Sequence, residues 1–259
     1  MSKHIQLLDN FERLGLRRIQ EYYPNYAELV NREGISFSDA LLELTTRELE
    51  FRHHTKIQRM IEKAKFPTHR ELKDFDFQFQ PSIPKQEILS LESLGFMERT
   101  QNILFIGNSG VGKTHLAIAI GVEACRQNVK TLFINCHELI QKLQAAYQKG
   151  TLERVLKRYA NYHLLIIDEI GYLPIAKQEA NLLFQLIRLR YEAHSTIFTT
   201  NTPLSMWGEI FQDTAVTGAI LDRLVHHSIR FQITGQSYRM KDYRESKELR
   251  MKEPITNKT

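Results

Sequence analysis

The stretch Gly107-Asn108-Ser109-Gly110-Val111-Gly112-Lys113-Thr114 has the spacing G-x-x-x-x-G-K-[ST] of a phosphate-binding loop. The apolar run 103–106 before it predicts a buried strand, and the run 115–120 after it predicts a helix, which a plain glycine-rich turn does not require. Glycines let backbone N–H groups turn toward a polyphosphate, and the helix N-terminus adds partial positive charge. Lys113 can reach the outer phosphates, and Thr114 can offer its hydroxyl to Mg²⁺. We therefore expect ATP to bind Gly107, Asn108, Ser109, Gly110, Val111, Gly112, Lys113, Thr114 and His115.

A second apolar run, Leu164-Leu165-Ile166-Ile167, ends in Asp168-Glu169. Four apolar residues in a row are typical of a central parallel strand that is covered on both faces. The carboxyl ends of parallel strands form the ligand crevice, so both carboxylates are expected beside the phosphate-binding loop. Asp168 would hold Mg²⁺ together with Thr114, and Glu169 would polarise the attacking water.

Strands and helices alternate from residue 103 onward. Strands are expected at 103–106, 131–135, 164–168, 195–200 and 229–233, with helices between them. This order predicts a parallel sheet with right-handed crossovers, the α/β fold of a P-loop NTPase. Residues 1–70 show helical periodicity, with Ser36 and Asp39 spaced for capping, and prolines 81 and 84 then interrupt the pattern. We therefore expect a helical N-terminal domain at 1–70, which contacts DNA or a partner, and an ATPase domain at 71–259.

Composition limits the possible classes of protein. The 259 residues are 42% apolar, enough for one domain of usual size and a smaller one. They contain no apolar run of the roughly 18 residues that cross a bilayer, and the N-terminus lacks an apolar signal segment, so we expect a cytoplasmic protein without a membrane partner. Cys125 and Cys136 fit no metal-binding spacing. The net charge of +5 modestly favours an anionic partner.

Basic residues are concentrated between positions 52 and 73. Arg52, Lys56, Arg59 and Lys63 follow at i, i+4, i+7 and i+11, so they lie on one face of a helix, whereas Ile57 and its apolar neighbours lie on another. One interpretation is that these four residues bind DNA phosphates. The other, equally open, is a solvated face of a helix that only packs on its neighbours. The basic run 239–252 predicts an exposed helix or tail.

Several segments together resemble a known family. They are the stretch 74–80, the loop 107–114 with His115-Leu116-Ala117, the strand end 167–172, the triplet Thr199-Thr200-Asn201 and the stretch 220–228. This combination resembles the IstB ATP-binding proteins, the AAA+ helper subunits of bacterial insertion-sequence transposition, whose near relatives are the DnaC helicase loaders. The resemblance covers nearly the whole chain.

The resemblance implies further roles for particular residues. Asn201 corresponds to the sensor between the acidic residues and the γ-phosphate, and Arg223 to the arginine that reaches the nucleotide of a neighbouring subunit. Residues 137–162 resemble the extra helical element of the initiator and loader branch, which implies self-association into filaments. The residues alone leave other roles open: Asn201 as a turn residue before Thr202-Pro203, and Arg223 in a surface ion pair. Only 26 residues follow Ile233, too few for a full helical lid, which leaves Arg239 as the one nearby second-sensor candidate.

The expected function is an ATP-dependent DNA-binding regulator of transposition. It would assemble on duplex DNA in a largely sequence-independent way and act on a partner transposase. Its ATP hydrolysis would be faster when it is assembled or bound to DNA. A helicase loader of the DnaC type is the main alternative, and a small-molecule kinase on the same phosphate-binding loop is a third. The sequence does not specify the stoichiometry, the DNA target or the surface that contacts the transposase.

Overall fold

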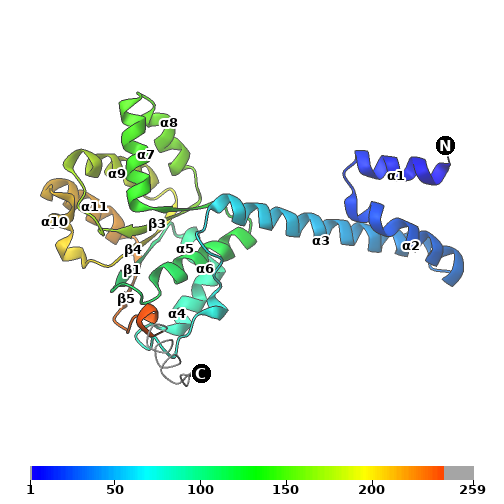
Figure 1. The fold of residues 1–259 in the computed structure, drawn as a ribbon, viewed down its shortest axis with the longest axis horizontal. Coiled ribbons are helices and arrows are strands. Elements are labelled where there is room, and N and C mark those ends of the chain that lie inside the picture. Colours follow the sequence, from blue (N-terminus) through cyan, green and yellow to red (C-terminus); the bar gives the residue numbers. More distant parts are fainter. Residues whose placement is uncertain (1, 242–259) are drawn as a thin grey trace, which may run out of the picture. The chain divides into compact units, whose positions relative to one another are not determined.

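The computed structural model describes residues 2–241, and its contacts divide the chain into two compact units (Figure 1). The division lies between Arg59 and Met60, inside the helix α3 (Phe37–Ala64). The sequence predicts this boundary near residue 70, about ten residues closer to the C-terminus than the observed division. Ile61 and Phe66 pack against an apolar cluster of the second unit, which explains why the segment after Arg59 belongs to that unit.

The first unit consists of α1 (Lys3–Arg13), α2 (Arg17–Glu33) and the beginning of α3. Ser36 accepts a hydrogen bond from the backbone N–H of Asp39 and so caps α3 as the sequence predicts. The buried carboxylate of Glu48 accepts from the N–H groups of Arg18 and Ile19 at the start of α2. Burial by itself would raise the pKa of Glu48, but hydrogen bonds from Arg52 and these two N–H groups hold it below the usual value. This carboxylate ties α3 to α2.

The second unit is built on a five-stranded parallel sheet with the order β2-β3-β4-β1-β5. Its strands are β1 (Asn102–Gly107), β2 (Thr131–Asn135), β3 (Leu164–Ile170), β4 (Ser195–Thr200) and β5 (Ser228–Ile233). Every expected strand is present, and the α/β fold is confirmed. Because β4 lies between β1 and β3, it separates the phosphate-binding loop from the acidic strand end.

Helices cover both faces of this sheet, and the strands alternate between the two apolar clusters as the pleat requires. In β1, Leu104 and Ile106 face one cluster while Ile103 and Phe105 face the other. The first cluster includes residues of α7 (Cys136–Gln148), α8 (Leu152–Ala160), α9 (Lys177–Arg190), α10 (Trp207–Phe211) and α11 (Thr214–His226). The second includes residues of α6 (Lys113–Arg126), α4 (Lys85–Ser90) and α5 (Gly95–Glu98).

Short turns of 3₁₀ helix complete the fold at Leu72–Asp74, Leu91–Ser93 and Leu204–Met206. The helices α7 and α8 occupy the segment 137–162, where the sequence predicts extra helical structure (Figure 1). None of the helices within residues 2–241 has both the length and the hydropathy of a membrane span.

Candidate nucleotide-binding site

The phosphate-binding loop joins the end of β1 to the start of α6. Gly110 and Gly112 have φ angles of 80° and 101°, in the region that favours glycine. A Cβ atom on Gly112 would lie 2.5 Å from the ring of Phe75, so this position also has no room for a side chain. Gly112 precedes α6 directly, and within the described part of the chain no side chain caps its first turn. Its backbone N–H groups thus suit an anionic ligand, and these residues fit a triphosphate.

The ammonium group of Lys113 lies inside this loop. Its Nζ donates hydrogen bonds to the carbonyl oxygens of Gly107 and Asn108, both at 2.7 Å. Burial lowers the pKa of Lys113, and the nearby carboxylates of Asp168 and Glu169 partly offset that effect. The loop therefore holds a desolvated positive charge close to the first turn of α6.

Hydroxyl groups of the phosphate-binding loop and of β4 donate hydrogen bonds to Asp168 near the end of β3. Thr114 Oγ1 donates to Asp168 Oδ1 at 2.9 Å, and Thr199 Oγ1 on the intervening strand donates to the same oxygen at 2.5 Å. Burial raises the pKa of Asp168, while these two hydrogen bonds favour its ionised form. An ionised carboxylate beside a threonine hydroxyl fits the oxygen ligands of Mg²⁺. Thr199 was not predicted as an individual site residue, although the triplet Thr199-Thr200-Asn201 contributes to the family resemblance.

Glu169 has an unusual backbone. Its φ angle is 60°, and the pairing of β3 with β4 shifts register between Ile167 and Ile170. Such a bulge turns side chains away from the regular alternation of a strand, so Asp168 is buried while Glu169 is exposed. The Glu169 N–H donates to Thr199 Oγ1 at 2.9 Å, which holds the bulge in place.

Asn135 holds the Glu169 side chain. Its Nδ2 donates to Glu169 Oε2 at 2.9 Å, and its Oδ1 accepts from the N–H of His137 at the start of α7. One side chain thus connects the acidic pair to the helix after β2. Asn135 was not predicted as a site residue, although a polar residue at the end of an apolar strand was an available signal.

A cavity of about 520 Å³ surrounds the loop, a volume within the usual range for small-molecule sites. The predicted residues in its lining are Ser109, Gly110, Gly112, Lys113, Thr114, His115, Glu169 and Asn201. Two further segments contribute to the lining. One, between Pro67 and Asp76, was not predicted, and the other contains Tyr238 and Arg239, of which only Arg239 was a candidate from the sequence.

Glu71 fixes the first of these segments. Its carboxylate makes ion pairs with His69, Lys73 and Arg126, the last of which lies on α6. Hydrogen bonds from Lys73, His69 and Arg126 lower the pKa of Glu71 to about 2. The Glu71 carbonyl also lies 3.1 Å from His115 Nε2. The segment is therefore attached to the same helix that carries Lys113 and Thr114.

The second segment follows β5. The N–H of Tyr238 donates to the carbonyl of Gly110 at 2.9 Å, and Gln80 Nε2 donates to the carbonyl of Gln236 at 2.6 Å. These contacts bring Arg239, the second-sensor candidate, into the lining of the cavity. The basic run 239–252 lies outside the described residues from position 242 on.

Arg223 lies away from this cavity. It is half-buried on α11, with its guanidinium 5.0 Å from the ring centre of Phe184 and 5.9 Å from that of Tyr191. Its Nη1 donates to the carbonyl of Ala219. The structure thus does not bring Arg223 together with Lys113, Glu169 and Asn201 in this chain.

The four residues expected to contact DNA all lie on α3 and are exposed. Arg52 already has partners in the first unit, because its Nε donates to Glu48 at 2.7 Å and its Nη2 donates to the carbonyl of Gly15 at 3.1 Å. Lys56, Arg59 and Lys63 remain as the members of the group best suited to an external anion.

Replacing Lys113 with alanine should weaken ATP binding at least tenfold. The variant loses a charged donor, and a hydrogen bond to a charged group contributes about 1.5–3 kcal/mol. The measurement is a calorimetric titration with ATP. Lys130→Ala is the matched control, since Lys130 is exposed and stacks on Tyr162 instead of lining the cavity. Unchanged affinity in a folded Lys113→Ala protein would contradict the assignment of the loop.

Comparison with known proteins agrees with this geometry. The family model for IstB-like ATP binding proteins matches residues 10–246. A relative from Bacillus thuringiensis subsp. berliner, named for insertion sequence IS232 and for ATP binding, is 47% identical and covers 93% of this chain and 97% of its own length. A second, from Geobacillus stearothermophilus and named for IS5376, is 42% identical over 90% of this chain and 92% of its own.

Solved structures share the fold at low sequence identity. The crystal structure of DnaI has a TM-score of 0.56 at 19% identity and covers 68% of this chain and 94% of that one. AMPPCP-bound DnaA from Aquifex aeolicus has a TM-score of 0.56 at 18% identity and covers 71% of this chain and 56% of that one. The sheet and the loop thus have the same fold as these solved structures, and the chain belongs to the family of IstB-like ATP-binding proteins.

Proposed function

We propose that this protein is a Mg²⁺-dependent ATPase that assembles on DNA and regulates the transposase of an insertion sequence. The observation that carries the ATPase part is the hydrogen bond between Thr114 and Asp168, with Glu169 as the next residue. It supports a metal-binding role for Thr114 and Asp168 and a role as base for Glu169 beside the phosphate-binding loop.

Each residue has a distinct role in this proposal. Lys113 and the N–H groups at the start of α6 neutralise the outer phosphates of ATP, and Asn201 at the end of β4 orients the attacking water or contacts the γ-phosphate. Thr114 and Asp168 hold Mg²⁺, which supplies positive charge to the phosphate oxygens when bound. Glu169 accepts the proton of the water at its carboxylate, with Asn135 orienting that group. Arg239 is a further contact for the nucleotide.

The role in transposition is supported by the relatives. Those at 47% and 42% identity are named for insertion sequences, whereas the helicase-loader alternative rests on structures below 25% identity that share the fold alone. We therefore prefer transposition to helicase loading. DNA is the proposed polyanionic partner because the charge is +5 and exposed basic residues follow one another on α3.

Glu169→Gln should bind ATP normally but hydrolyse it about 10²–10⁴ times more slowly, because the amide cannot accept the proton while Asp168 still serves the metal. The variant should consequently remain on DNA in the presence of ATP. Turnover and DNA retention are measured side by side by phosphate release and filter binding.

Asp222→Asn is the control for that variant, as it makes the same kind of change at an exposed carboxylate on α11. Rapid hydrolysis by Glu169→Gln would exclude this residue as the base. Loss of ATP binding would show that it holds the nucleotide instead.

Arg223 is proposed to act on the ATP of a neighbouring subunit, since it does not line the cavity of its own chain among the described residues. Arg223→Ala should keep its ATP affinity but lose the increase in hydrolysis with protein or DNA concentration. An arginine supplied in trans contributes roughly 10³–10⁵ in rate. Mixing Arg223→Ala with Lys113→Ala should restore activity, because the first supplies an intact loop and the second an intact arginine.

The control mixture pairs Arg223→Ala with the double variant Lys113→Ala, Arg223→Ala, in which no subunit offers the arginine. Equal activity of the two mixtures would refute the trans role.

The DNA contacts can be tested by salt dependence. If Lys56 and Arg59 each neutralise a duplex phosphate, the double change to glutamine should reduce the slope of log affinity against log salt by about 1.8, at saturating ATP. Affinity should fall about equally on unrelated sequences. Arg13→Gln, Arg32→Gln is the control, with the same charge change at two exposed arginines of the first unit. An unchanged slope in the Lys56, Arg59 variant would place the DNA site elsewhere.

A further inference from the structure

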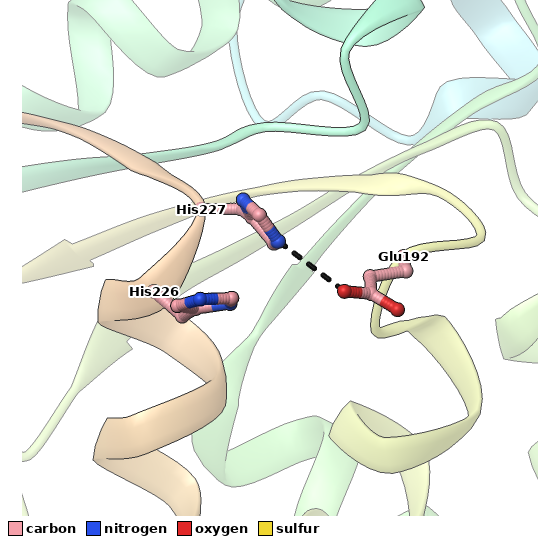
Figure 2. A group of neighbouring side chains, drawn as sticks. All are labelled: Glu192, His226 and His227. Atoms are coloured by element: carbon pink, nitrogen blue, oxygen red, sulfur yellow. Dashed lines mark hydrogen bonds and ion pairs between the residues drawn. The ribbon is translucent and has the colours of Figure 1, made fainter.

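The side chains of Glu192, His226 and His227 lie close together (Figure 2). They lie at the end of the sheet opposite the nucleotide cavity, where β4 and β5 begin. Glu192 lies in the turn that leads from α9 to the start of β4. His226 is the last residue of α11, and His227 follows it directly before β5. The nucleotide residues lie at the carboxyl ends of β1, β3 and β4. The group is therefore separate from the nucleotide cavity of its own chain.

The spacing of these three side chains suits a shared metal ion. One ligand atom from each residue lies within 4.8 Å of the other two. His227 Nε2 and Glu192 Oε1 are 3.2 Å apart, close to the roughly 3.3 Å between two ligands of a tetrahedral Zn²⁺ with bonds of 2.0–2.1 Å. The side chains of two consecutive residues in a helix normally point in different directions. His227 leaves the helical conformation, with φ −118° and ψ 67°, and the ring centres of His226 and His227 are 4.0 Å apart.

The surroundings hold this arrangement in place. Arg190, at the end of α9, is buried, and it donates to Thr196 Oγ1 and to the carbonyls of Tyr159, Ala160, Tyr162 and Ser195. These hydrogen bonds hold Arg190 in position at the beginning of the turn that carries Glu192. Glu192 itself has a φ angle of 56°. The hydroxyl of Tyr191 lies 2.8 Å from His226 Nδ1. A hydrogen-bond partner on one ring nitrogen orients a histidine ligand.

We propose that Glu192, His226 and His227 bind a zinc ion. Two imidazoles and one carboxylate favour Zn²⁺ over Mg²⁺, which prefers an octahedral set of oxygen ligands. Three protein ligands leave the fourth position of the tetrahedron for water. The ion would join the turn after α9 to the end of α11, one helical turn beyond Arg223. The nearby guanidinium of Arg223, which stacks on Tyr191, opposes the ion electrostatically, and the Glu192 carboxylate offsets this charge.

The test is a zinc titration of the untagged full-length protein, free of nucleotide, against a chromophoric chelator. We expect one Zn²⁺ per chain and an increase of about 5 °C in Tm at a hundredfold excess over Kd. Glu192→Gln and His227→Gln should each weaken zinc binding at least tenfold and reduce the Tm increase by about half or more at the same zinc concentration. Co²⁺ should give the visible absorption of a tetrahedral site in the unmodified protein but not in Glu192→Gln or His227→Gln.

The matched control is His163→Gln, His194→Gln, which alters another pair of neighbouring histidines, with ring centres 5.4 Å apart. It should bind zinc as the unmodified protein does. In chelator, Glu192→Gln and His227→Gln should match the unmodified protein in Tm and ATP affinity, which separates loss of the ligand from loss of the fold. No zinc bound at micromolar concentration, or equal affinity in the ligand and control variants, would overturn the proposal.

Discussion

The site depends on one contact across the sheet, the hydrogen bonds from Thr114 and Thr199 to Asp168. Three neighbouring parallel strands have to end at the same level for these side chains to meet. The register of β1 and β3 on β4 provides that alignment, with Phe105 beside Thr199 and Ile167 beside Phe198. Desolvation disfavours the ionised form of Asp168, and the hydrogen bonds from the two hydroxyl groups stabilise that form.

The same strand ends shape the rest of the cavity. At the bulge in β3, Asp168 is buried, whereas Glu169 is exposed and accepts a hydrogen bond from Asn135. One strand thus supplies a proposed metal ligand and a proposed base with different surroundings. The walls come from two segments bonded to the loop and to α6, around Glu71 and around Tyr238. A nucleotide held there would contact parts of the chain that lie far apart in sequence.

The two ends of the sheet have different chemistry. The carboxyl ends hold the cavity, whereas the amino ends hold Arg223, Tyr191 and the three proposed zinc ligands. In the proposed assembly, Arg223 serves the cavity of a neighbouring subunit, so the amino end of one sheet approaches the carboxyl end of another. Arg223 and the proposed zinc ligand His226 both lie on α11, so a shift of this helix would move both side chains.

The sequence by itself determined the strands, the phosphate-binding loop, the acidic pair and the family, because each is a local pattern of apolar runs and glycine or charge spacing. It also indicated Asn201, now in the cavity lining, through the family motif. Only the tertiary structure decided the strand order, the bulge at Glu169, the parts played by Thr199 and Asn135, and the meeting of Glu192 with His226 and His227. These features arise from pairing between residues 30 or more positions apart, for which a single sequence carries no local signal.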